Sequence, residues 1–173
     1  FSNYGLILQG LGNLEEAEFF TRKAIQLNPG YATAHYNLGI ILEGFGKLKE
    51  AKQSFYKAIE LKPEHAESYS HLGKLFERLN ESKRAEEFFR SAIKLDPNLA
   101  EANSNLSAIL QKSGKSKEAE SFSLKAVKIN PFYAIAFYNL GVIQQDLGKL
   151  KDSKIAYLKA IKLDPKHAKS YTN

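Results

Sequence analysis

The prolines of this chain recur at a constant interval. All five of them keep a spacing of 34 residues with no insertion or deletion: Pro29, Pro63, Pro97, Pro131 and Pro165. A period of about 20–50 residues is typical of stacked repeat units rather than of a globular domain with one central core. The sequence therefore predicts a repeat fold, and the interval supplies a register for numbering the places within each unit.

Alanines that recur at the same interval give a convenient first place. With Ala32 as place one, complete repeats cover 32–65, 66–99, 100–133 and 134–167; residues 1–31 form a repeat without its first three places, and 168–173 begin a sixth. We expect residues 1–173 to form one array without a second domain.

Each repeat carries two short stretches of helical periodicity. In 32–65, Leu38 and Leu42 belong to the first stretch, and Phe55 and Ile59 to the second, with a break at Gly46 and Lys47. Pro63 then ends the second stretch, because proline lacks an N–H and disfavours a helical residue before it. The pattern predicts two helices of about 12–14 residues per repeat, each too short to be stable alone, and an all-α fold.

Small residues at fixed places predict close packing between these helices. Glycine occupies the eighth place in four of the five repeats, and alanine occupies the twenty-seventh in all five. Glycine inside a helix costs about 1 kcal/mol relative to alanine, so its recurrence indicates a close approach. The second helix also keeps an aromatic residue, which stands at the twenty-fourth place (Phe55, Phe89, Tyr157) or at the twenty-third where the next residue is small (Phe20, Phe122).

Together these places resemble the tetratricopeptide repeat (TPR) family. The resemblance rests on Leu-Gly at places seven and eight, alanine at places 20 and 27, and proline at place 32, and it covers essentially the whole chain. Departures are local: His35 and Asn103 stand where a larger residue is usual, and Gln144 replaces an apolar residue. The resemblance implies a right-handed superhelical solenoid whose first helices line a concave groove, and it implies a protein or peptide partner.

The sixth place of the first helix carries an unusual row of amides. It reads Asn3, Asn37, His71, Asn105, Asn139 and Asn173. Asparagine is a poor helix former, so its recurrence within helices needs a reason. A carboxamide can pair with both the C=O and the N–H of a peptide, and the row resembles the asparagine ladder of the O-linked N-acetylglucosamine transferase TPR superhelix. The alternative is that each asparagine bonds a neighbouring helix, and both roles stay open.

The resemblance implies further groove residues beside this row. Tyr36, Ile40, Lys74, Arg78, Tyr138 and Val142 complete the predicted peptide-binding site. Partial burial against adjacent helices is the alternative for the apolar members. TPR domains that clamp acidic chaperone tails use Lys and Asn where this chain has Ser2 and Leu6, so that subclass is not expected.

No pattern in the sequence indicates catalysis, a cofactor or a metal site. The four histidines are scattered, and His65 and His167 stand three repeats apart. The net charge of +6 is weak evidence for nucleic acid, because the places predicted to face the groove carry acids as well as bases. No apolar run approaches the roughly 20 residues of a membrane-spanning helix. We expect a non-enzymatic protein that binds neither nucleic acid nor membrane and is located in the cytoplasm.

The sequence therefore predicts a non-catalytic scaffold that binds an extended peptide or protein segment. Two alternatives remain: a substrate-recruiting arm of a larger transferase-type enzyme, and an architectural or self-assembly module. The chain contains no methionine, which indicates a fragment of a longer protein. Because its terminal repeats lack capping helices, we also expect end-to-end self-association near Phe1 and Tyr171.

Overall fold

A computed structural model describes residues 13–166, so the predicted site residues Asn3 and Asn173 lie outside the described part. The described residues form nine helices and no strand, which confirms the all-α repeat fold. The helices are α2 (Leu14–Leu27), α3 (Ala32–Gly44), α4 (Leu48–Leu61), α5 (Ala66–Arg78), α6 (Ser82–Leu95), α7 (Ala100–Lys112), α8 (Ser116–Ile129), α9 (Ala134–Asp146) and α10 (Leu150–Leu163). None of these helices is long and apolar enough to cross a membrane.

Every complete repeat has the same two-helix plan. Its first helix has 13 residues and its second has 14, as α3 and α4 do. The proline is the second residue after the second helix. In repeat 32–65, α4 ends at Leu61, the Lys62 N–H donates the last helical hydrogen bond to the Ala58 carbonyl at 2.9 Å, and Pro63 follows. Proline therefore lies where it interrupts no helical bond, and the 34-residue spacing records the helix ends.

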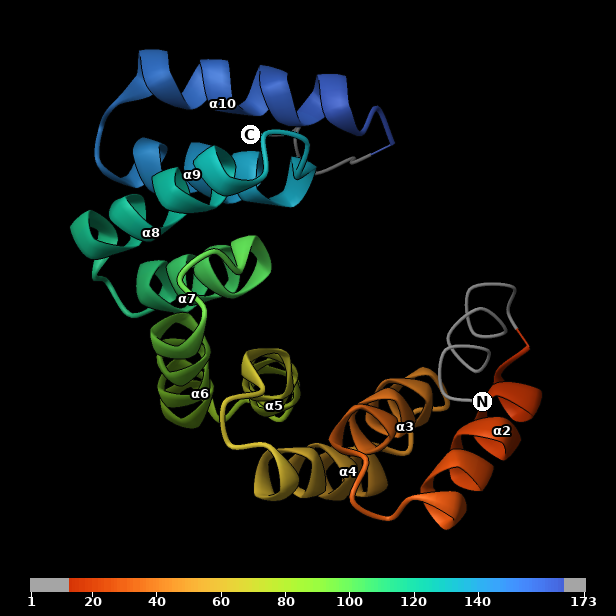
Figure 1. Cartoon of the computed structure of the whole chain (residues 1–173). Helices are drawn as coiled ribbons and strands as arrows, with labels where there is room; N and C mark the ends of the chain where they lie inside the picture. The colour runs from red at the N-terminus through yellow and green to blue at the C-terminus, as the bar shows by residue number, and fades with distance from the viewer. Residues whose placement is uncertain (1–12, 167–173) are drawn as a thin grey trace. The chain divides into compact units, whose positions relative to one another are not determined.

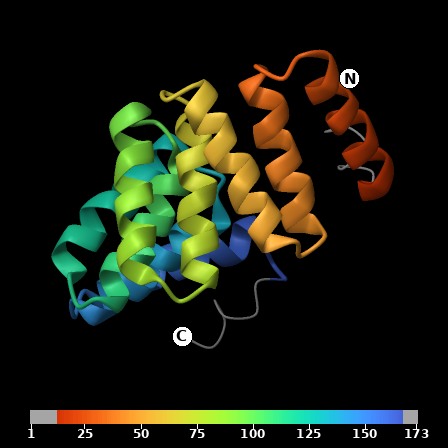
Figure 2. The same ribbon diagram turned by 90° about the horizontal axis from the view of Figure 1, so that it is seen from below.

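The helices belong to two compact units, 1–75 and 76–173, with the division inside α5. In the first unit, α3 packs on both α2 and α4, and Figure 2 shows these helices side by side at the red and orange end of the chain. In the second unit, α8 packs on α7 and α9, α10 packs on α9, and α7 also contacts α9 (Figure 1). The first helices α7 and α9 are therefore neighbours, and the second helix α8 packs on both of them.

A left-handed residue ends the first helix of each complete repeat. Gly46, Gly114 and Gly148 have φ of 73°, 75° and 72°, and Asn80 has 61° at the same fifteenth place. The following N–H then folds back onto the helix, as from Lys47 to the Leu42 carbonyl at 2.9 Å. This is the usual helix end that favours glycine and tolerates asparagine.

The eighth-place glycines lie directly against the aromatic residue of the second helix. A β-carbon on Gly39 would stand 2.5 Å from Cε1 of Phe55, and one on Gly141 would stand 2.7 Å from Cδ1 of Tyr157. Repeat 100–133 has fully buried serines at both places, Ser107 and Ser123. A side chain is therefore accommodated at the eighth place where no ring stands at the twenty-fourth.

Ion pairs between consecutive repeats also recur at fixed places. The lysine before the second helix contacts a glutamate on the second helix of the preceding repeat, in the pairs Lys47–Glu18 (3.5 Å), Lys115–Glu86 (3.4 Å) and Lys149–Glu120 (2.6 Å). Burial raises the pKa of the Glu86 carboxyl, but hydrogen bonds from Arg90 and Lys115 outweigh it and hold the pKa below its ordinary value. Each exposed pair contributes at most about 1 kcal/mol, so the pairs align repeats more than they stabilise them.

Candidate functional site

A shallow hollow lies between the two neighbouring first helices of the second unit. This α7/α9 hollow has a volume of about 220 Å³ and is lined by Ala108, Gln111, Lys112, Tyr138, Asn139, Val142 and Ile143. Three predicted site residues, Tyr138, Asn139 and Val142, therefore meet in one place. Val142 and Tyr138 are half-buried, so part of each side chain faces solvent.

The two sixth-place asparagines of this unit differ in their hydrogen bonds. Nδ2 of Asn139 donates to Oγ of Ser104 at 3.0 Å and lies 3.4 Å from the Ser104 carbonyl, which ties α9 to α7. Asn105 on α7 is half-buried, and no hydrogen bond joins its carboxamide to another described residue. One amide therefore bonds a neighbouring helix, whereas the other keeps its donors and acceptor available.

Charged groups beside the hollow are paired. Nζ of Lys112 lies 2.8 Å from Oε1 of Glu77, and Nε2 of Gln111 donates to Oδ2 of Asp146 at 2.6 Å. Both contacts join places twelve and thirteen of consecutive first helices. The hollow thus has a polar rim with opposite charges rather than a continuous cationic track.

In the first unit the predicted site residues are packed more tightly. Asn37 is fully buried, and Nδ1 of His71 lies 3.0 Å from Oε2 of Glu43, joining α5 to α3. The Tyr36 ring lies against the His71 ring at a centroid distance of 5.4 Å. Ile40 is half-buried. These side chains contribute mainly to packing between α3, α4 and α5.

The two cationic site residues lie on α5, one turn apart. Lys74 is half-buried and Arg78 is exposed. Their spacing of four residues places them on the same side of the helix. They fall on either side of the division between the two units.

His65 is an almost fully buried histidine at the end of repeat 32–65. It is 9% exposed, and Oγ of Ser68 lies 3.0 Å from its Nδ1. Burial lowers the pKa of its ring below the ordinary value. Burial likewise raises the pKa of Tyr133 to about 12, with a further contribution from the charge of Glu101. No group of three potential metal ligands occurs among residues 13–166.

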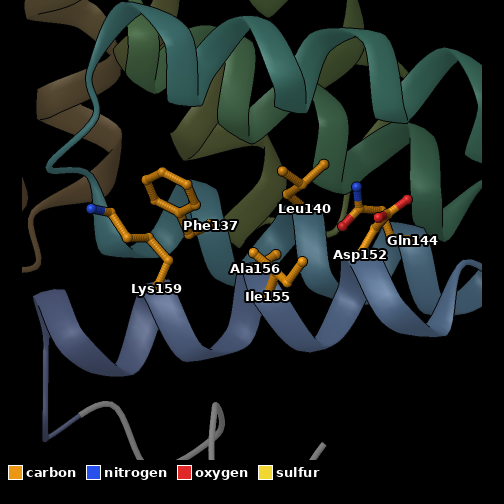
Figure 3. Close-up of a pocket in the computed structure, with 7 residues that line it drawn as sticks. All are labelled: Phe137, Leu140, Gln144, Asp152, Ile155, Ala156 and Lys159. Atoms are coloured by element: carbon orange, nitrogen blue, oxygen red, sulfur yellow. The ribbon is translucent and has the colours of Figure 1, made fainter.

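A second hollow, which the sequence did not predict, lies between α9 and α10. This α9/α10 hollow has a volume of about 340 Å³ and is lined by Phe137, Leu140, Gln144, Asp152, Ile155, Ala156 and Lys159 (Figure 3). Its residues occupy places four, seven and eleven of α9, on the side of that helix opposite the α7/α9 hollow at about 100° per residue. The available signal was the small Ala156 at the twenty-third place beside the unusual Gln144.

Comparisons with known proteins agree with the repeat register. Two family models described as tetratricopeptide repeat match the chain, one over 32–65 and 134–167 and the other over 1–31, 66–99 and 100–133. No curated protein matches the chain significantly.

Solved structures of similar fold include three whose sequences differ widely from this one. A crystal structure described as YrrB, a TPR protein with an unusual peptide-binding site, has 29% identity over 99% of this chain and 88% of its own, with a TM-score of 0.71. MamA has 23% identity over 95% of this chain and 96% of its own, with a TM-score of 0.74. Pseudomonas aeruginosa pilF has 19% identity over 97% of this chain and 77% of its own, with a TM-score of 0.87. With family models matching every repeat, the chain belongs to the tetratricopeptide repeat family.

Proposed function

We propose that the chain is a non-catalytic scaffold that binds an extended polypeptide segment across α7 and α9. TPR repeats generally mediate protein–protein interaction without catalysis. The observation that carries this proposal is the α7/α9 hollow, where the predicted residues Tyr138, Asn139 and Val142 meet. The similarity to YrrB, whose description names a peptide-binding site, supports it.

We assign different roles to Asn139, which lines this hollow, and to Asn105, which stands on α7 three residues before the lining residue Ala108. Asn105 would bond the main chain of the ligand, because its carboxamide bonds no other described residue. Asn139 would hold α9 against α7 through Ser104, so the two roles expected for the row would apply at different places. Tyr36, Ile40, His71 and Lys74 are proposed binding residues of the first unit and Arg78 of the second, whereas the burial of Asn37 favours a structural role.

The test uses peptides selected from a random 12-residue library on the immobilised chain, with affinity measured by fluorescence anisotropy. Val142→Glu should weaken binding at least about tenfold, since a desolvated carboxylate without a partner is strongly unfavourable. Leu124→Glu on α8 makes a similar apolar-to-acid change at a residue that is 48% exposed, away from both hollows, and should leave affinity unchanged. Equal losses in both variants would contradict the proposed site.

The asparagine roles have separate readouts. Asn105→Ala should weaken peptide binding and leave the free energy of unfolding unchanged or raised by about 0.5 kcal/mol, because alanine is the better helix former. Asn139→Ala should lower that free energy by about 1 kcal/mol through the lost hydrogen bond. A stability loss for Asn105→Ala with unchanged binding would assign that residue to structure.

The two alternatives remain open proposals. A recruiting arm of a larger transferase-type enzyme would use the same α7/α9 surface, and the length of the parent protein distinguishes it from an independent scaffold. Self-association through the terminal repeats involves Phe1 and Tyr171, which lie outside the described residues. Light scattering during size-exclusion chromatography tests it, and a single monomeric mass at high concentration would oppose it.

A further inference from the structure

The α9/α10 hollow corresponds to a position that an aromatic ring occupies in neighbouring repeats. In repeat 66–99 the twenty-third residue, Phe88, stacks on the eleventh, Phe76, with ring centroids 5.2 Å apart and planes 14° apart. In repeat 134–167 the same two places hold Ala156 and Gln144. Repeat 66–99 also has a ring at the twenty-fourth place, Phe89, and repeat 134–167 keeps only this second ring, as Tyr157, which packs on Gly141. The α9/α10 hollow lies where the ring of the twenty-third place is missing.

The middle of the α9/α10 hollow is apolar, and its ends carry polar side chains. Figure 3 shows Leu140, Ala156 and Ile155 in the middle, with Phe137 and Lys159 at one end and Gln144 and Asp152 at the other. Nζ of Lys159 lies 5.9 Å from the centre of the Phe137 ring. The volume of about 340 Å³ is at the low end of the range for small-ligand pockets. Ile155 is 67% exposed, so this apolar surface is open to solvent.

Gln144 gives the hollow an unsatisfied polar group. The residue is 7% exposed, and its Oε1 is buried and accepts no hydrogen bond from any described residue. Repeats 32–65 and 100–133 have leucine at this place, as Leu42 and Leu110. A buried amide oxygen without a donor is unfavourable, and a phenol hydroxyl can donate to such an oxygen.

From these observations we infer that the α9/α10 hollow is a second interaction site, which takes the tyrosine side chain of a partner polypeptide. The phenol ring would fill the volume that Phe88 fills in its own repeat, against Leu140, Ala156 and Ile155. Its hydroxyl would pair with the carboxamide of Gln144. The site is on the side of α9 opposite the α7/α9 hollow, so a partner anchored here would not compete with a peptide bound there, and the inference does not depend on the proposed function.

The chain contains a matched control. Repeat 32–65 also has a small residue at the twenty-third place, Ser54, and a hollow of about 240 Å³ beside it. That hollow is lined by the charged residues Arg22, Glu50 and Lys57 and has Leu42 in place of the glutamine. A phenol ring would meet His35 and Gln53 there, where the α9/α10 hollow has the apolar Phe137 and Ile155, so we expect it to bind only between α9 and α10.

The test titrates the ¹⁵N-labelled chain with p-cresol, the side-chain analogue of tyrosine, and with toluene, the analogue of phenylalanine. p-Cresol should shift the amide signals of α9 and α10 and bind about three- to tenfold more tightly than toluene, the factor expected for one hydrogen bond. Ala156→Phe restores the ring that repeats 66–99 and 100–133 carry at this place and should abolish binding of both probes. Gln144→Leu should retain toluene binding and remove the preference for p-cresol, whereas Ser54→Phe should change neither.

The opposite outcomes overturn the inference. Equal affinity for the two probes in the unaltered chain would exclude a phenol-specific site, and binding that survives Ala156→Phe would exclude the hollow. Tyr171, outside the described residues, is a possible occupant from the chain itself. If Tyr171→Ala alone shifts the signals of the lining residues and strengthens p-cresol binding, the hollow belongs to that residue and not to a partner. Circular dichroism confirms that each variant is folded.

Discussion

Replacement of Gly141 by alanine should destabilise the chain, although alanine is the better helix former. The added β-carbon would lie 2.7 Å from Cδ1 and Cε1 of Tyr157, well inside normal van der Waals separation of about 3.5 Å. The ring cannot readily retreat, because it is 7% exposed and its hydroxyl donates to Oε1 of Gln145 at 2.9 Å. Overpacking costs about 1–3 kcal/mol, against a gain of about 1 kcal/mol in helix propensity. We therefore expect a net loss of up to about 2 kcal/mol.

The effect of Gly141→Ala on the free energy of unfolding should change sign when the Tyr157 ring is removed. In a Tyr157→Ser background, which reproduces the small twenty-fourth residue of repeat 100–133, the obstruction is gone. Gly141→Ala should then stabilise the chain by about 1 kcal/mol through helix propensity alone. The comparison is a double-mutant cycle between residues in direct contact, where non-additivity is expected.

Urea unfolding followed by circular dichroism measures the four free energies. Because repeat arrays unfold in parts, hydrogen exchange of the α9 amides supplies a local measure for the same variants. Gly39→Ala should show a larger loss, since its β-carbon would lie 2.5 Å from Cε1 of the fully buried Phe55. A stabilising Gly141→Ala in the unaltered chain, or the same effect in both backgrounds, would refute the packing argument.

Three other predictions follow from single residues. Asn80→Gly should stabilise the chain by up to about 1 kcal/mol, because its φ of 61° suits glycine, whereas Gly114→Asn should have the opposite effect in urea unfolding. Gln144→Leu should raise the unfolding free energy by about 1–3 kcal/mol by removing an unsatisfied buried carboxamide, and no change in urea midpoint would mean that the group is solvated. His65 has a pKa lowered by burial, so the unfolded chain binds the proton more readily and stability should fall as pH drops below the ordinary value of about 6.5. His65→Leu should flatten the dependence of urea midpoint on pH between 7 and 5, and an unchanged slope would exclude His65 as its source.

The repeat plan could be predicted from the sequence because each feature of it is local. The prolines follow the ends of the second helices, and glycine or asparagine at the fifteenth place adopts the left-handed conformation that ends the first helix. The packing of Gly39 on Phe55 was also accessible, since a costly glycine recurs opposite an aromatic residue. These signals depend on residues within one repeat, and the period displays each of them several times.

The candidate site was less accessible, because exposure depends on neighbouring repeats. The same asparagine place is fully buried as Asn37, bonded to an adjacent helix as Asn139, and without a bond to another described residue as Asn105. Nothing within a single repeat distinguishes these environments. The α9/α10 hollow escaped prediction for a related reason: Gln144 is unusual within its own helix, but the space also depends on the small Ala156 on the facing helix.

The recurring lysine–glutamate pairs have a consequence for the order of the repeats. In all three observed pairs, lysine stands at the sixteenth place and glutamate at the twenty-first place of the preceding repeat. The charges are exchanged in two repeats: the sixteenth place of repeat 66–99 is Glu81, and the twenty-first place of repeat 32–65 is Lys52. If 66–99 followed 100–133, Glu81 would oppose Glu120; if 100–133 followed 32–65, Lys115 would oppose Lys52. Duplication or shuffling of single repeats would therefore bring like charges together, so the units share one backbone plan without being interchangeable in sequence.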